Sequence, residues 1–441
     1  MNKTQRHIAT FPAAALLLAI LLFPVESGAR GDGLLIEGDN TLFPLGSYEL
    51  PGDDAELAAM AEAGFNLFQC RDLEDLDRVQ AVGAQGWVAL PLEQGATDGL
   101  EERVSALNEH PALAVWHGPD EFVWHLTASS RHLDRYDIPT RRHWWNLEDN
   151  ALEAAKEQAR QEIPKLIEGI ELLRAIDTGD RQIWFNEARR SDVRYVREFV
   201  DYIDIIGPCG YPVRSEGDTG GGDINRTGPD VLRWKEAGKG KPVWNVLQAF
   251  SFDELRDPDA AEPVFPSFWQ SRFMAYTSIT HGASGILYWG SHRMASEESE
   301  KFRESWLSLV SELSQLQPFW TAPELSQVTA HCIRSIPPGG DRHHFAEREP
   351  DSGVTSTARR FGRDWLIVLV NEDDEAKMSV EVRGLDHING TTLELLYGAE
   401  EIDVRDGRMV TRMKPYEVKL FATSRKWETD KRAGREYDGN Q

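Results

Sequence analysis

Two adjacent acidic residues, Asp120 and Glu121, have the side chains and the position that general acid catalysis requires. They follow the apolar run 113–117 (LAVWH), which predicts a buried strand. Neighbouring carboxylates repel each other, and partial burial raises the pKa of at least one of them toward neutral pH. We therefore predict Glu121 as a general acid and Asp120 as the partner that shifts its pKa. The structural alternative is that Pro119-Asp120 begins a turn and Asp120 caps the next helix.

Polar and aromatic residues also end most of the other apolar runs of the sequence. Carboxylates and amides can bind pairs of sugar hydroxyls, and aromatic rings can stack on a pyranose ring. The sequence therefore favours a carbohydrate as the binding partner. The residues expected to bind it are Glu49, Arg71, Asn186, Tyr211, Gln248 and Trp289. Tyr48, Glu93, Glu187 and His292 also lie at the ends of apolar runs.

The elements that position these residues are short strands alternating with amphipathic helices, a pattern typical of βα units and a parallel sheet. The strands are predicted at 43–50, 66–71, 87–92, 113–117, 182–186, 203–207, 242–247 and 285–289. Eight such units predict a (β/α)₈ barrel over residues 30–323. Because active sites of these barrels lie at the carboxyl ends of the strands, the residues named above should share one mouth.

Several of the candidates also have structural explanations. Trp289 could be a barrel-closing aromatic ring, and Gly-Tyr-Pro around Tyr211 is also a plausible turn. Arg71 could bind a carboxylate or steady Asp120, or it could form an ion pair with a neighbouring strand. An irregular insertion over 123–146 carries aromatic residues that we expect to pack against the barrel: Trp124, Trp144 and Trp145.

The pattern changes after Pro323. Short strand-like runs are separated by turn sequences such as Asn389-Gly390 and Asp406-Gly407, which predicts a small antiparallel β-sandwich over 324–424. Residues 425–441 have almost no apolar content and are predicted to form a disordered tail.

The N-terminus has the layout of a secretory signal peptide. Lys3 and Arg6 precede the apolar run 11–25, and small residues follow at 27–29. The run is shorter than the roughly 20 residues that cross a bilayer, which disfavours the alternative of an uncleaved anchor. We expect residues 1–29 to be removed and the protein to be secreted or periplasmic.

The charge balance excludes two classes of partner. Lys and Arg number 48 against 73 Asp and Glu, a formal net charge of −25, which is unsuited to nucleic acid or to an anionic membrane. The sequence contains no H-E-x-x-H, G-x-S-x-G or P-loop pattern, so we expect no metal and no cofactor. Three widely spaced cysteines, Cys70, Cys209 and Cys332, indicate neither a disulfide framework nor a zinc module.

Through the residues at its predicted strand ends, the sequence over about 42–320 resembles the retaining glycoside hydrolases of the large (β/α)₈ clan. In that clan the acid/base Glu follows strand four. The resemblance implies that Glu121 is the acid/base, Tyr211 the strand-six Tyr and Trp289 the strand-eight Trp. The stretch 281–289 (HGASGILYW) is similar to the strand-eight ending of many uncharacterised bacterial barrels. Many of these enzymes also carry a small C-terminal β-sandwich.

The sequence departs from that clan at strand seven, where Gln248 stands in place of the nucleophilic Glu. An amide cannot form the covalent glycosyl intermediate. Three explanations stay open. An acetamido group of the substrate could be the nucleophile, in which case Asp120 could orient it instead of acting as the pKa partner of Glu121. The enzyme could also invert with Glu187 or Glu49 activating water, or the barrel could bind a glycan without cleaving it. We expect an exported glycoside hydrolase-like protein acting on a poly- or oligosaccharide, with a carbohydrate-binding pseudoenzyme as the alternative.

Overall fold

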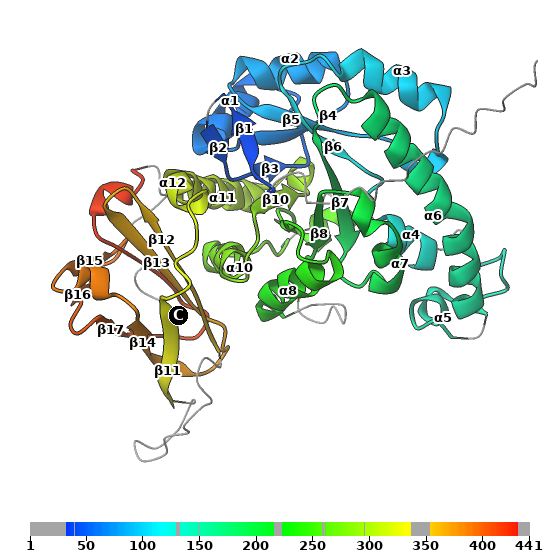
Figure 1. Cartoon of the computed structure of the whole chain (residues 1–441). Helices are drawn as coiled ribbons and strands as arrows, with labels where there is room; N and C mark the ends of the chain where they lie inside the picture. The colour runs from blue at the N-terminus through cyan, green and yellow to red at the C-terminus, as the bar shows by residue number, and fades with distance from the viewer. Residues whose placement is uncertain are drawn as a thin grey trace, which may run out of the picture.

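The computed structural model describes residues 32–38, 40–128, 133–148, 150–215, 223–257, 260, 262–294, 296–336 and 353–430. They form a closed barrel followed by two antiparallel sheets (Figure 1). The signal peptide predicted at residues 1–29 lies outside the described residues. No helix in these ranges combines the length and the apolar character needed to cross a bilayer.

The barrel consists of parallel strands, and each of them lies within or beside a run predicted from the sequence. In chain order they are β3 (Leu45–Ser47), β4 (Leu67–Cys70), β5 (Gln85–Ala89), β6 (Leu113–His117), β7 (Gln182–Ala188), β8 (Ile205–Cys209), β9 (Trp244–Gln248) and β10 (Gly285–Trp289). Pairing of β10 with β3 closes the barrel. The predicted (β/α)₈ fold is therefore confirmed.

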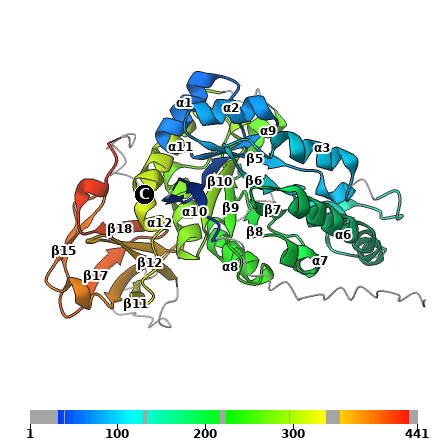
Figure 2. The same cartoon turned by 45° about the horizontal axis from the view of Figure 1, so that its top comes forward.

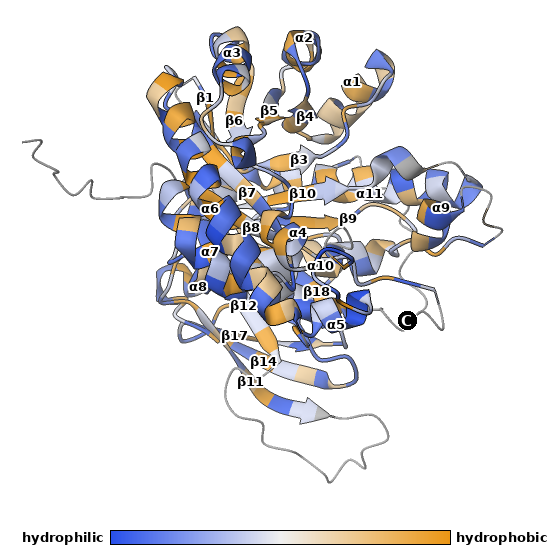
Figure 3. Cartoon of the chain, turned by 90° about the vertical axis from the view of Figure 1, so that its right-hand side faces the viewer, coloured by the Kyte–Doolittle hydropathy of each residue, from blue (hydrophilic) through white to orange (hydrophobic). Residues whose placement is uncertain are grey.

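Helices surround the barrel. They are α1 (Asp54–Ala63), α2 (Leu73–Ala81), α3 (Asp98–Leu107), α4 (Phe122–Ala128), α5 (Arg141–Trp145), α6 (Ala151–Ile176), α7 (Val193–Phe199), α8 (Thr227–Ala237), α9 (Phe252–Arg256), α10 (Phe268–Thr280), α11 (Glu297–Gln315) and α12 (Gln317–Trp320). Short 3₁₀ turns lie between strands and helices: η1 (Leu92–Gln94) and η5 (Ser291–Arg293) follow strands, η3 (Val200–Tyr202) follows α7, and η4 (Ile224–Arg226) precedes α8. Figure 3 shows hydrophobic residues in barrel strands such as β9 and hydrophilic residues on α6 and α7. This pattern places the apolar core between the strands and the helix ring.

Aromatic rings fill the barrel interior. Trp184 lies 5.6 Å from Trp87 and 5.2 Å from Trp244, measured between ring centroids. The N-terminal end is closed by a hairpin of β1 (Leu35–Glu37) and β2 (Asn40–Leu42), which the sequence analysis did not predict. Trp244 Nε1 donates a hydrogen bond to the carbonyl of Gly33, 2.8 Å away, at this end. Because side chains occupy the interior and the hairpin covers one end, a ligand can reach the barrel axis only from the carboxyl ends of the strands.

The C-terminal region forms the predicted sandwich (Figure 2). One sheet has the order β11 (Thr329–Ile336), β14 (Lys377–Arg383) and β17 (Arg408–Met413). The other has the order β12 (Val354–Phe361), β13 (Asp364–Asn371), β18 (Val418–Ala422), β15 (Thr392–Leu395) and β16 (Glu401–Asp403), and a 3₁₀ turn, η6 (Asp386–Ile388), precedes β15.

A buried ion pair attaches this sandwich to the barrel. Arg272 Nε of α10 lies 2.7 Å from Glu312 Oε1 of α11, and Arg272 Nη1 donates to the carbonyl of Val418 at 2.8 Å. Tyr276 also donates to Glu312. Breaking such a buried pair leaves an uncompensated charge, so these contacts fix the sandwich beside α10.

The chain stays folded beyond the sandwich. Residues 425–427 form the turn η7 (Arg425–Trp427), and Trp427 is 8% exposed because its ring packs on Phe319 at 4.7 Å. The disordered tail predicted from residue 425 is therefore wrong for residues 425–430, and one large aromatic ring explains the difference. Residues 431–441 lie outside the described residues.

Candidate functional site

The turn after β6 holds Asp120 and Glu121 in an unusual backbone conformation. Glu121 has φ +49°, in the left-handed region that costs a non-glycine residue about 1–3 kcal/mol. Its N–H donates to the carbonyl of Asn186 at 3.0 Å, which ties the turn to β7. Gly118 is needed just before it, because a Cβ there would lie 2.1 Å from the ring of Phe185. The strained turn directs the two adjacent carboxylates to different partners.

Asp120 is exposed and lies among hydrogen-bond donors. Its Oδ1 accepts from Asn186 Nδ2 at 2.7 Å and from the Tyr48 hydroxyl at 3.4 Å. The carboxylate therefore lies between β3 and β7 on the barrel axis and does not cap α4. The Glu187 carboxylate binds the first N–H groups of α4 instead, with Val123 N at 2.8 Å.

Glu121 occupies a drier environment. Burial raises the pKa of its carboxyl group, and the charge of Asp120 raises this pKa further. Cys209 of β8 donates from Sγ to Glu121 Oε1 at 2.8 Å, which acts in the opposite direction and lowers the pKa. Burial also raises the pKa of the Cys209 thiol well above its usual value, so this cysteine is a neutral donor and not a thiolate nucleophile.

Two tyrosines complete the mouth on the barrel axis. Burial raises the pKa of both the Tyr48 and the Tyr211 hydroxyl, and nearby acidic groups add to the shift. Both phenols therefore stay protonated and can donate hydrogen bonds. Below them His117 packs on Trp184 with 4.5 Å between ring centroids, and burial lowers the pKa of His117 to about 4, which keeps its ring neutral.

Trp289, the last residue of β10, and Tyr211, just after β8, form an aromatic wall at the mouth. Their rings are stacked with centroids 5.3 Å apart and an interplanar angle of 26°. Phe250 packs edge-on against Trp289 at 4.9 Å and thereby fixes the ring plane. Both residues of the wall are half-buried, so each keeps part of its surface open to a ligand.

Two other carboxylates at strand ends are engaged by protein groups. Glu187 is 0% exposed and also accepts from the Ser191 hydroxyl at 2.6 Å, while burial raises its pKa to about 8. Glu49 binds the loop after β10, accepting from Gly290 N at 2.9 Å, from Ser291 and from His292 Nδ1 at 2.9 Å. These contacts give both residues a structural role in holding loops.

The amide of Gln248 is likewise occupied. Its Oε1 accepts from Val213 N at 3.0 Å, and its Nε2 donates to the carbonyls of Val213 and Phe250 at 2.9 and 3.0 Å. Gln248 is fully buried. It fixes the segment after Tyr211 and presents no free hydrogen-bonding group to a substrate.

Arg71 does not enter the mouth. Its guanidinium binds the Asp75 carboxylate, with Nε and Oδ2 2.8 Å apart, and its side chain is 81% exposed. The predicted contact with a substrate carboxylate or with Asp120 is therefore replaced by an ion pair with Asp75 in the first turn of α2. Of the predicted substrate-binding residues, the structure brings Asn186, Tyr211 and Trp289 together around the Asp-Glu pair.

The insertion aromatics are divided between two environments. Trp144 is fully buried and packs the insertion against the first turn of α6. Trp145 is 51% exposed and stacks on Trp124, with centroids 6.1 Å apart.

Sequence reasoning missed Cys209 and His117 as residues of the mouth. The available signal was strand alternation: Cys209 lies two positions before Tyr211, so both side chains point to the same side of β8. His117 is the last residue of β6, so its position at a strand end was a signal of the same kind. In the part of the chain that the structure describes, no three His, Cys, Asp or Glu side chains gather in a metal-binding arrangement.

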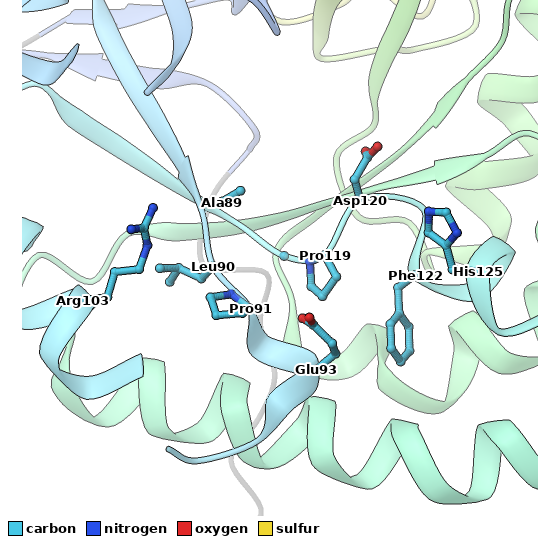
Figure 4. Close-up of a pocket in the computed structure, with 10 residues that line it drawn as sticks. Ala89, Leu90, Pro91, Glu93, Arg103, Pro119, Asp120, Phe122 and His125 are labelled. Atoms are coloured by element: carbon cyan, nitrogen blue, oxygen red, sulfur yellow. The ribbon is translucent and has the colours of Figure 1, made fainter. Parts of the chain in front are cut away.

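A cavity of about 630 Å³ reaches Asp120 from the side (Figure 4). It lies between the loops that follow β5 and β6, and its lining includes Pro91, Glu93, Arg103 and Pro119. This cavity opens beside the Asp-Glu pair at the mouth.

Comparisons with known proteins agree with this architecture. No family model and no curated protein sequence matches the chain. A glycoside hydrolase family 5 structure from Bacteroides vulgatus is similar over 89% of this chain and 92% of its own, with 15% identity and a TM-score of 0.50. A beta-galactosidase from Bacillus circulans sp. alkalophilus is similar over 86% and 98%, with 10% identity and a TM-score of 0.50.

A beta-galactosidase from the psychrophilic Marinomonas ef1 has a TM-score of 0.42 and 13% identity over 62% of this chain, which spans 60% of that protein's length. At identities this low the likeness concerns the fold. The chain therefore has the (β/α)₈ barrel fold of glycoside hydrolases, followed by a C-terminal β-sandwich.

Proposed function

We propose that this protein is a glycosidase acting on a poly- or oligosaccharide, with Glu121 as the general acid. The observation that carries the proposal is the contrast between the two carboxylates after β6. Asp120 is exposed and accepts hydrogen bonds from Tyr48 and Asn186, whereas burial raises the pKa of Glu121. Two adjacent acids, one exposed and one buried, are an arrangement typical of acid/base catalysis.

The arrangement of the other carboxylates favours one of the three mechanisms left open by Gln248. An inverting enzyme needs a second carboxylate that activates water, but Glu187 is fully buried under α4 and Glu49 binds the loop after β10. Glu93 lies in the neighbouring cavity, which leaves Asp120 as the second carboxylate on the barrel axis. Asp120 lies beside Glu121, where it can orient an acetamido group of the substrate.

In the reaction that follows from this arrangement, Glu121 donates its proton to the glycosidic oxygen as the bond to the anomeric carbon breaks. The acetamido carbonyl oxygen of the substrate forms the new bond to that carbon. Asp120 accepts a hydrogen bond from the acetamido N–H and stabilises the positive charge that develops there. Water then opens the cyclic intermediate, with Glu121 as the base that takes back a proton.

Hydrolysis of matched glycosides tests the proposal. Wild-type protein should release sugar from 2-acetamido glycosides and not from the same glycosides with a 2-hydroxyl group. Glu121→Gln should lower kcat by about 10²- to 10⁴-fold, the usual contribution of a general acid. Glu101→Gln, an exposed substitution on α3, is the control. Equal activity of wild type and Glu121→Gln would remove Glu121 from the chemistry.

A carbohydrate-binding protein without hydrolytic activity is the second candidate, and the occupied amide of Gln248 favours it. The aromatic wall of Tyr211 and Trp289 would serve such a protein equally well. Glycan-array binding without release of any product would support this function over hydrolysis.

We also propose that the protein is exported, on the basis of the signal-peptide pattern at residues 1–29. N-terminal sequencing of the protein recovered from the medium or periplasm of the producing cell tests this. A mature N-terminus near residue 30 is expected, and recovery of the intact N-terminus from the cytosol would contradict export.

A further inference from the structure

The cavity between the loops after β5 and β6 has features of a binding subsite beyond the groups assigned to catalysis, although Asp120 forms part of its lining. Figure 4 shows the Glu93 carboxylate turned toward Pro119, whereas the side chain of Asp120 points away from Glu93. The cavity thus has its own acid, separated from the hydrogen bonds that Asp120 makes on the barrel axis.

The position of Glu93 is fixed by packing. It lies in the middle of η1, which follows Pro91 and packs against α6. Gly169 of α6 permits this contact, because a Cβ at residue 169 would lie 2.2 Å from the carbonyl oxygen of Leu92. This close backbone packing fixes where Glu93 lies.

The carboxyl group of Glu93 has a hydrogen bond from the N–H of its own backbone, which lowers its pKa, and one oxygen is left over. Its Oε2 is buried and has no hydrogen-bond partner among the described residues. Burial raises the pKa of Glu93, and the charge of Glu162 adds to the shift. A buried polar atom without a partner costs free energy, which a ligand that donates a hydrogen bond would recover.

The rest of the lining suits the apolar face of a sugar ring. Ala89, Pro91 and Pro119 are half-buried and offer C–H surface next to the acid. The acidic groups of the lining disfavour anionic sugars. Glu93 and Asp120 both line the cavity, so an anionic sugar would lie next to two carboxylates. Arg103 also lines the cavity, but it is exposed and donates to the carbonyl of Arg71 at 3.0 Å.

We propose that this cavity is a subsite for a neutral sugar residue, in which Glu93 binds ring hydroxyls and sets which sugar lies next to the Asp120–Glu121 pair. The subsite rests on the proposed carbohydrate-directed function, but it requires only that the protein bind a glycan. Hydrolysis and binding must therefore be measured separately.

Binding is measured by titration calorimetry with chitotetraose, cellotetraose and tetragalacturonate. The protein carries Glu121→Gln so that turnover does not consume the probe. At least one neutral tetrasaccharide should bind, and adding Glu93→Ala should weaken that binding by roughly 10- to 100-fold, as expected for loss of a charge-assisted hydrogen bond. Glu93→Gln keeps the shape of the side chain and one hydrogen-bond acceptor, so it should weaken glycan binding less than Glu93→Ala does. Glu101→Ala, an exposed substitution on α3, should leave it unchanged.

Three outcomes would overturn the subsite: no binding of either neutral tetrasaccharide, binding that is unaffected by Glu93→Ala in a protein with an unchanged melting temperature, or binding of tetragalacturonate that depends on Arg103. If the neutral glycan binds through Glu93 while wild-type protein hydrolyses nothing, the subsite stands and the glycosidase proposal fails. If hydrolysis occurs, Glu93→Ala should raise KM with little change in kcat, whereas Glu121→Gln should lower kcat.

Discussion

The Cys209 thiol donates a hydrogen bond to the Glu121 carboxylate, with 2.8 Å between Sγ and Oε1. This contact joins the end of β8 to the turn after β6, so two strands of the barrel determine where the proposed acid lies. The hydrogen bond favours the charged form of Glu121 and lowers its pKa, against the larger effect of burial. Cys209 is therefore a positioning residue that also limits how far the pKa of Glu121 rises.

Substitution of Cys209 should move the pH profile of hydrolysis. An acid catalyst is active while protonated, so activity falls as the pH rises through its pKa. Cys209→Ala removes the donor, raises the pKa of Glu121 and should shift the alkaline limb of kcat/KM to higher pH, with a several-fold lower kcat from looser positioning. Cys209→Ser keeps a donor, so its alkaline limb should lie at or below that of wild type.

Cys332→Ala provides the matched control, because this buried cysteine belongs to the sandwich core. Its pH profile should overlay that of wild type. Identical profiles for Cys209→Ala and wild type would show that the thiol does not act on Glu121.

A second prediction concerns the stability of the fold as a function of pH. Burial raises the pKa of Glu187 from 4.5 to about 8 in the folded protein. Between these values the unfolded chain releases a proton that the folded protein retains, so each pH unit lowers the free energy of unfolding by about 1.4 kcal/mol. Glu187→Gln cannot titrate. Its stability should match wild type near pH 5 and exceed it increasingly toward pH 8.

Urea denaturation at several pH values measures this difference. Glu101→Gln, which removes an exposed carboxylate, should show no such divergence from wild type. A constant gap between Glu187→Gln and wild type from pH 5 to pH 8 would mean that Glu187 is already ionised in the folded protein.

The fold was predictable because its elements are local and repetitive. Every barrel strand overlaps an apolar run, and the sandwich strands overlap short strand-like runs separated by turn residues. The hairpin at 35–42 was missed because its strands are short and mostly exposed, and because it is held by distant residues such as Gln85, whose Nε2 donates to the carbonyl of Ile36. The burial of Trp427 was missed for the same reason, because its ring packs on Phe319, which is distant in the sequence and belongs to the barrel domain.

The site was predictable only to the level of strand ends. Asn186 points at Asp120 while the next residue, Glu187, points under α4, because successive residues of a strand face opposite sides. If the predicted end of β7 is moved by one residue, the roles of Asn186 and Glu187 are exchanged. The sequence alone does not determine which of the two side chains faces the barrel axis. For Arg71 a local signal was available: Asp75 is four residues away, the spacing of an ion pair on a helix.

A third prediction tests the aromatic wall. Trp289→Ala removes a stacking surface, whose contribution of about 1 kcal/mol corresponds to roughly a 5- to 10-fold weaker affinity for an oligosaccharide. Trp289→Phe keeps a ring against Tyr211 and Phe250 and should recover part of the affinity. Trp145→Ala, on the insertion, serves as the control and should bind normally in the same titration. Unchanged affinity in Trp289→Ala would assign Trp289 to packing alone.

The last prediction asks whether a nucleophile can be restored at strand seven. Gln248→Glu places a carboxylate where the clan's nucleophile would stand, but Nε2 of Gln248 donates to the carbonyls of Val213 and Phe250, and a carboxylate cannot. Two buried carbonyls would then face a negative charge, so the substitution should lower the free energy of unfolding by about 2–4 kcal/mol and give no gain in kcat. Thermal unfolding and hydrolysis assays measure both effects, with the exposed substitution Gln80→Glu of α2 as the control. A gain in kcat at unchanged stability would show that position 248 can face the substrate, and the loop-holding role of its amide would then be wrong.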